Sequence, residues 1–280
     1  MTRVFIVGQH RTGSTWLKNI LDAHSSVVMA FDEMNLYEPF RKDTLSRLIS
    51  RGDTSSHQIV DAIFSKRVYG TFWQDINKSG LTKHQLSCAL GDRDRLTERD
   101  VLDAVLVILQ SFENKSFVGA KYPVHVSKMA RLLDWFPDSK VIFITRDPSS
   151  IIASKLNDSA TIRRKKISVF HRFFIHYFTL IYFCFEFRIS VKTYFSNKDK
   201  VFKLSYEELL VEPERAVRRL CDYVGLTFER EMLESDGKPS SHKLVSRRIS
   251  NSGVYASALN RFDRILISLL TRSFFRRIRD

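Results

Sequence analysis

The segment that most constrains the fold lies at residues 8–15, which read Gly-Gln-His-Arg-Thr-Gly-Ser-Thr. The glycine and hydroxyl positions match the phosphate-binding loop G-x-x-x-x-G-K-[ST], which joins a strand to a helix. Ser14 stands where that motif has lysine, and another cation, Arg11, lies inside the loop. Because the P-loop lysine reaches the phosphates that phosphoryl transfer acts on, its displacement favours a phosphate-like ligand used for other chemistry.

The residues on either side of this loop have the pattern that it requires. Residues 4–7 are an apolar run, VFIV, which is typical of a buried parallel strand. Apolar residues recur at helical spacing within 16–21. A strand, a turn and a helix N-terminus therefore follow in order, which directs backbone N–H groups and the helix dipole at an anion. A tight turn without a ligand is the alternative.

The rest of the chain alternates strands with helices, which predicts a parallel α/β sheet. We predict a three-layer, P-loop-type parallel sheet with helices on both faces, forming a single domain over residues 1–280. A helical insertion at 31–115 is expected to cover the site, and 256–280 to form a basic amphipathic helix. Further strands are expected at 117–121, 140–145 and 201–204, and helices at 43–50, 98–110, from Ser127 to about 136, and at 213–224.

Composition narrows the class of protein. Hydrophobic residues make up 44% of the 280 residues and charged residues 27%, which excludes a disordered chain. The net charge of +14 favours polyanionic partners, such as nucleotides, sulfated glycans or an anionic membrane. Three widely spaced cysteines form no zinc or disulfide pattern, which suits a reducing compartment. The first strand begins by residue 4, so we expect no signal peptide and a cytoplasmic location.

A second candidate anion site follows the strand at 140–145. That strand ends in Arg146-Asp147-Pro148, and Ser154 lies eight residues after the arginine. Ligands of open α/β sheets bind at the carboxyl ends of strands, where Arg146 would offer a planar fork to phosphate oxygens. A simple ion pair between Arg146 and Asp147 is the alternative.

Two anion sites on one sheet edge suit a nucleotide phosphorylated at both ends, and here the chain resembles a family. Residues 4–17 resemble the 5′-phosphosulfate loop of the sulfotransferases that use 3′-phosphoadenosine 5′-phosphosulfate (PAPS). Residues 140–154 are similar to the 3′-phosphate motif of that family. Residues 205–226 resemble its Y-E-[DE]-L…P…F-L-G segment, and 245–255 its late loop over the cofactor. The four segments follow in the family's order.

The resemblance implies how the site is divided. The loop amides with Ser14 and Thr15 would hold the 5′-phosphosulfate, and Arg11 would stabilise charge on the leaving phosphate. Arg146 and Ser154 would bind the 3′-phosphate. No metal is implied, because arginine and amides take the place of Mg²⁺. The residues implied in cofactor binding are Arg11, Thr12, Gly13, Ser14, Thr15, Trp16, Arg146, Ser154, Tyr206, Ser246, Arg247, Ser252 and Gly253.

The acceptor hydroxyl needs a general base. Glu33 is the first candidate, because glutamates near this position serve in many glycan and tyrosine sulfotransferases, and Asp32 is its neighbour. His125 is the second, although it lies beyond the proline of 119–123 rather than before it. Lys121 matches the family's lysine and could touch the sulfuryl group or the acceptor.

The function implied is direct, in-line transfer of a sulfuryl group from PAPS to an acceptor hydroxyl. The resemblance leans toward the carbohydrate branch, so a glycan or glycolipid is expected, while tyrosyl peptides and small hydrophobic alcohols stay open. One alternative is a nucleotide kinase or NTPase, and another is an anionic-surface binding module with a vestigial loop. We expect no nucleic-acid partner.

Two apolar stretches bear on membranes. Residues 167–187 are strongly aromatic but interrupted by charges, and 261–280 carry six arginines beside an apolar stripe. Each could pack on the domain, or lie against an anionic membrane as a peripheral contact.

Overall fold

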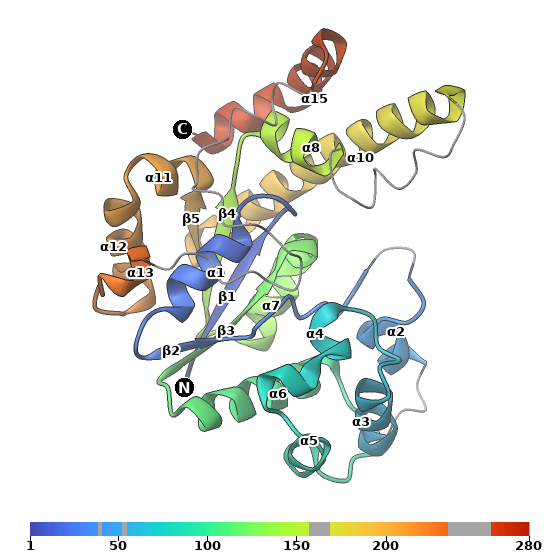
Figure 1. Cartoon of the computed structure of the whole chain (residues 1–280), viewed down its shortest axis with the longest axis vertical. Helices are drawn as coiled ribbons and strands as arrows, with labels where there is room; N and C mark the ends of the chain where they lie inside the picture. The colour runs from blue at the N-terminus through green and yellow to red at the C-terminus, as the bar shows by residue number, and fades with distance from the viewer. Residues whose placement is uncertain (39–40, 52–54, 157–168, 235–258, 280) are drawn as a thin grey trace.

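A computed structural model describes the chain except residues 39–40, 52–54, 157–168, 235–258 and 280, and except the side chains of 123–125 and 169–172 (Figure 1). Its centre is a five-stranded sheet in the order β2-β3-β1-β4-β5, in which all neighbouring strands are parallel. The strands are β1 (Thr2–Gly8), β2 (Val27–Met29), β3 (Phe117–Tyr122), β4 (Lys140–Thr145) and β5 (Val201–Ser205).

Helices fill the connections between these strands. Helix α1 (Ser14–Asp22) joins β1 to β2. The segment between β2 and β3 contains α2 (Leu45–Ser50), α3 (Ser56–Phe64), α4 (Thr71–Gln74), η1 (Ile76–Ser79), α5 (Lys83–Leu90) and α6 (Glu98–Glu113). The remaining described helices are η2 (Pro123–Lys128), α7 (Met129–Trp135), α8 (Pro148–Leu156), α10 (Val169–Asn197), η4 (Lys198–Lys200), α11 (Tyr206–Val211), α12 (Pro213–Val224), α13 (Glu231–Glu234) and α15 (Arg261–Arg279).

The sheet is buried on both faces, as a parallel sheet requires. On β1, Phe5 and Val7 point into one hydrophobic cluster, whereas Val4 and Ile6 point into another. The first cluster is completed by the helices between β2 and β3 together with α7, α10 and the end of α15. The second is completed by α1, α11, α12 and α13. The predicted three-layer fold is therefore confirmed, with the layers visible in Figure 1.

Local predictions were right where a strong signal existed. The four predicted strands form, and α12 starts at Pro213 and ends before Gly225, whose φ of 90° suits a helix terminus. The strand β2 was not predicted, because only three residues pair with β3 at the sheet edge.

Two predicted helix starts were wrong. Ser127 does not cap a helix, because Pro123 already begins the 3₁₀ helix η2 and α7 continues it from Met129. The C-terminal helix begins at Arg261 rather than at 256.

Helix α10 is longer than the predicted aromatic stretch and runs to Asn197. Its second half packs on the sheet, where the Tyr194 ring stacks on Phe143 at 5.1 Å. In the described part of the chain, one helical stretch, Phe173–Lys200, has the length and composition to cross a membrane.

Candidate functional site

The loop after β1 is compact and depends on its second glycine. Gly13 has a φ of 93°, which side chains rarely adopt, and it precedes the first residue of α1. A Cβ atom at this position would lie 2.5 Å from Cδ2 of Tyr206. The Thr12 hydroxyl donates a hydrogen bond of 2.8 Å to the Gln9 carbonyl and closes the loop. Arg11, with a φ of 71°, lies exposed at its tip.

The start of α1 faces the sheet edge without a capping side chain, because its N-cap residue is Gly13. The first N–H groups of a nine-residue helix are therefore available to an anion. Ser14 and Thr15, both predicted to hold the 5′-phosphosulfate, occupy the first two positions of this helix.

Lys121 links the loop to the acidic segment after β2. It is the last but one residue of β3. Its Nζ donates a hydrogen bond of 2.8 Å to the Thr15 hydroxyl and lies 3.8 Å from Asp32 Oδ1. Burial lowers the pKa of Lys121, while the charges of Glu33 and Asp32 oppose that shift. The structure therefore brings together three predicted site residues, Lys121, Thr15 and Glu33, although they lie far apart in sequence.

Glu33 has the environment expected of a general base. Burial raises its pKa from 4.5 to about 7, Lys121 lowers it, and Asp32 and Glu38 raise it. Its Oε1 is enclosed and has no hydrogen-bond partner among the described residues. A carboxylate with this pKa can take a proton near neutral pH.

The helical insertion holds the Glu33 segment in place. The Trp73 indole N–H donates to the Asn35 carbonyl at 2.7 Å, and the Phe72 ring stacks on Phe31 at 5.1 Å. Both contacts come from α4 and flank Glu33 in sequence, so the insertion fixes the backbone that carries the carboxylate.

The pKa of Glu33 makes stability depend on pH. Because the folded pKa is raised from 4.5 to about 7, the folded protein binds more protons than the unfolded chain in that window. The free energy of unfolding is therefore expected to fall as pH rises from about 4.5 to above 7, by up to about 3 kcal/mol in all. Replacing Glu33→Gln removes this penalty, so the variant should gain stability over wild type between about pH 5 and pH 8. Urea unfolding of the wild type and the variant at about pH 5 and about pH 8 measures the gain.

Glu113→Gln is the control for this experiment, because Glu113 is exposed at the end of α6. It should leave the difference between the two pH values unchanged. A Glu33→Gln variant with the same stability offset at both pH values would contradict the raised pKa.

Arg146 lies at the second predicted anion position, directly after β4. It is buried, its guanidinium donates to the Arg11 carbonyl at 3.1 Å, and its Nε has no hydrogen-bond partner among the described residues. Asp147 does not pair with it in the described part of the chain; Asp147 accepts from the Ser150 N–H and so caps α8. The arginine therefore presents an unsatisfied buried donor beside the phosphate loop, and Ser154 lies half-buried on α8.

Tyr206 braces the two anion positions rather than standing apart from them. The Arg146 guanidinium lies 4.2 Å from the centre of its ring, and Trp16 meets the ring edge-on at 5.7 Å. Its ring also lies against Gly13. The first residue of α11 thus fixes the loop relative to Arg146.

Sequence reasoning missed several buried polar residues around the loop. The Gln9 amide donates to Glu186 Oε2 at 3.0 Å and to the Phe183 carbonyl at 3.1 Å, tying the loop to α10. Burial raises the pKa of Glu186, and the Gln9 hydrogen bond lowers it. Lys18 is buried on α1, with Nζ 3.5 Å from the Phe31 carbonyl. A carboxylate inside an aromatic helix was the signal that could have revealed Glu186.

Some predicted residues cannot be placed. Ser246, Arg247, Ser252 and Gly253 lie outside the described residues. His125 lies on η2, but its side chain is also outside them.

Comparison with known proteins identifies the family to which this site belongs. The sequence matches the model of the sulfotransferase family over residues 3–230, which is most of the chain. The chain belongs to the sulfotransferase family. The family resemblance is therefore confirmed; three of its four segments lie within residues 3–230, whereas 245–255 lies outside both the matched and the described residues.

Solved sulfotransferase structures share the fold at low sequence identity. The sulfotransferase domain from the curacin biosynthetic pathway is 19% identical, covering 92% of this chain and 83% of its own, with a TM-score of 0.53. Sulfotransferase STF9 from Mycobacterium avium is 15% identical, covering 97% and 75%, with a TM-score of 0.55. The sulfotransferase domain from the Synechococcus PCC 7002 olefin synthase is 16% identical, covering 97% and 94%, with a TM-score of 0.56.

Proposed function

We propose that this sulfotransferase moves a sulfuryl group from PAPS to an acceptor hydroxyl, and that the step uses no metal ion. The observation that carries the proposal is the buried Arg146, whose Nε lacks a partner among the described residues while its guanidinium holds the Arg11 carbonyl. An unsatisfied buried donor is costly unless a ligand completes it. A 3′-phosphate at this position, with the 5′ group on the loop, satisfies it.

The residues around the loop fit a nucleotide with two anionic ends. The N–H groups at the start of α1, with Ser14 and Thr15, would hold the 5′-phosphosulfate. Arg146 and Ser154 would hold the 3′-phosphate. PAPS supplies the sulfuryl group when bound. The rings of Trp16 and Tyr206, which contact each other, border the same loop.

The transfer step follows from the charges at the site. The acceptor oxygen forms a bond to sulfur as the bond from sulfur to the 5′-phosphate oxygen breaks, and the hydroxyl proton passes to Glu33. The leaving phosphate gains negative charge, which Arg11 and Lys121 stabilise. Asp32 lies 3.8 Å from Lys121 and helps keep that lysine charged.

For the acceptor, we propose a sugar hydroxyl on a glycan or glycolipid. The half-buried Tyr69 supports this: burial raises its pKa, and the charges of Glu38 and Glu33 raise it further, which places its ring near the candidate base. Burial raises the pKa of Glu38, and the charge of Glu186 on α10 also raises it. Tyrosine rings with carboxylates offer stacking surfaces and hydrogen-bond acceptors to a polyhydroxylated substrate. We also propose that the chain is one domain acting in the cytoplasm, without a nucleic-acid partner.

The test is transfer of ³⁵S label from PAPS to a panel of glycans, glycolipids, tyrosyl peptides and small alcohols. Label on a sugar hydroxyl supports both the reaction and the acceptor class; label only on a peptide or an alcohol supports the reaction and overturns the acceptor. No transfer to any acceptor, together with Mg²⁺-dependent hydrolysis of ATP, would replace the proposal by the nucleotide kinase or NTPase alternative.

A further inference from the structure

The first halves of helices α10 and α15 lie away from the sheet, and the two helices pack against each other. Tyr177 of α10 meets Phe262 of α15 at 5.6 Å between ring centres, and Asp263 of α15 accepts a hydrogen bond of 3.0 Å from His176. Nearer the sheet, Phe187 meets Phe275 at 6.3 Å. In Figure 1 the first halves of both helices extend beyond the rest of the molecule.

One side of α10 is apolar and exposed. Its buried residues, among them Leu180, Cys184, Phe187 and Val191, recur at helical spacing on the side that faces the protein. The opposite side carries a stripe at spacings of three and four residues, and its centre, Phe178, is 73% exposed. The stripe consists of Phe174, Phe178, Ile181, Tyr182, Phe185 and Ile189.

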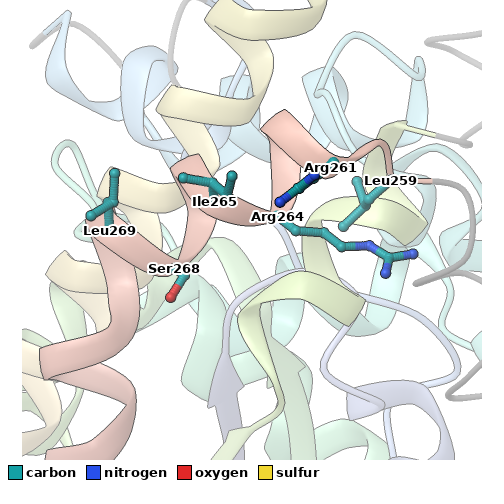
Figure 2. A pocket seen from close by; sticks show the side chains of 6 residues that line it. All are labelled: Leu259, Arg261, Arg264, Ile265, Ser268 and Leu269. Carbon is teal, nitrogen blue, oxygen red and sulfur yellow. The ribbon is translucent and has the colours of Figure 1, made fainter.

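Helix α15 also has an exposed apolar side, and exposed arginines follow it along the helix. Phe262, Ile265 and Leu269 are exposed, Leu269 to 77%, while Ile267 and Thr271 on the other side are buried. Figure 2 shows a shallow hollow at the start of this helix, where Arg261 and Arg264 lie beside apolar residues; it is lined by Leu259, Arg261, Arg264, Ile265, Ser268 and Leu269. Further along, Arg272, Arg276, Arg277 and Arg279 are all exposed.

We infer that this surface, the α10–α15 face, docks the protein on an anionic lipid bilayer. The face comprises the exposed stripe of α10 with Phe262, Ile265, Leu269 and the arginines of α15. Exposed aromatic and aliphatic side chains beside arginines suit the boundary between acyl chains and anionic headgroups. The net charge of +14 adds attraction to a negative surface.

Charge and packing argue against the other occupants. A symmetric dimer through this face would place the arginines of α15 against those of a second copy, which like charges disfavour. The acid at the start of α15, Asp263, is buried against His176 and cannot neutralise them. Helix α10 does not span the bilayer in this arrangement, because Leu180 and Phe187 keep its inner side in the protein.

The test is sedimentation of the full chain with phosphatidylcholine vesicles, with and without about one third phosphatidylglycerol. Binding is expected to be at least about tenfold tighter to the anionic vesicles and to weaken as salt rises. Leu269→Ser should weaken it by roughly tenfold, because a leucine no longer enters the bilayer. Combined replacement of Arg272→Glu and Arg276→Glu should abolish the preference for anionic lipid.

Val211→Ser is the matched control, since Val211 at the end of α11 is 79% exposed and Leu269 is 77% exposed. It should bind vesicles as the wild type does. Equal binding to both vesicle types, or equal effects of the two serine variants, would overturn the inference. The inference would also be overturned if Leu269→Ser lowered the sedimentation coefficient, which would indicate a dimer through this face, and left vesicle binding unchanged. Sulfuryl transfer to a soluble acceptor should be unaffected, which separates this surface from the chemistry of the site.

Discussion

Glu33→Gln is expected to lower kcat for sulfuryl transfer by about 10²–10⁴-fold, because it removes the group that takes the acceptor proton. Binding of 3′-phosphoadenosine 5′-phosphate should be nearly unchanged, since Lys121, and not Glu33, is the side chain that hydrogen-bonds Thr15 beside the phosphate loop. Steady-state kinetics of wild type and variant, with calorimetry of the bisphosphate, measures both effects.

The pH dependence of the rate distinguishes a base from a structural residue. With the pKa of Glu33 at about 7, kcat/KM of the wild type should rise through neutral pH as the carboxyl loses its proton. The Glu33→Gln variant should lose that rise, although it is expected to be the more stable protein at high pH. His125→Gln is the comparison, because His125 is the rival candidate. A large loss of kcat in His125→Gln, with Glu33→Gln active, would reassign the base.

Gly13→Ala is expected to weaken binding of 3′-phosphoadenosine 5′-phosphate by at least about 100-fold. In the Gly13→Ala variant the backbone would have to keep a φ of 93°, and the added Cβ would lie 2.5 Å from the Tyr206 ring. Displacing that ring also disturbs Arg146, whose guanidinium lies 4.2 Å from its centre. Both anion positions are therefore lost together, which calorimetric titration can measure.

Gly80→Ala separates strain from the clash. Gly80 also has a positive φ, 75°, but a Cβ there meets nothing within 4 Å. It should cost about 1 kcal/mol of stability through the backbone and leave nucleotide affinity intact. If Gly13→Ala bound the bisphosphate as well as Gly80→Ala does, the loop would not be the phosphate site.

The parts of this protein that follow from local sequence were predicted well. The apolar strands, the glycine loop and the helix that begins at Pro213 each have a local physical cause, so periodicity and turn chemistry reveal them. The three-residue strand β2 has too little sequence to give such a signal, and only its pairing with β3 defines it.

The polar contacts around the site depend on distant segments and could not be predicted. Gln9 and Glu186 are 177 residues apart, and their hydrogen bond exists because α10 packs beside the loop. The raised pKa of Glu33 arises mainly from its burial in the folded protein, which no spacing in the sequence reveals. Tyr206 was placed near the cofactor by the family resemblance alone, and its contacts with Gly13 and Arg146 depend on the order of the strands in the sheet.

The most direct test of the central claim is calorimetric titration of 3′-phosphoadenosine 5′-phosphate, beside ATP with Mg²⁺, into wild type and Arg146→Ala. We predict micromolar binding of the bisphosphate without metal, weakened by about 30–1000-fold in the variant through loss of charged hydrogen bonds. Arg131→Ala, which changes an exposed arginine on α7, should bind normally. Preference for ATP with Mg²⁺, or bisphosphate binding that survives Arg146→Ala, would contradict the account.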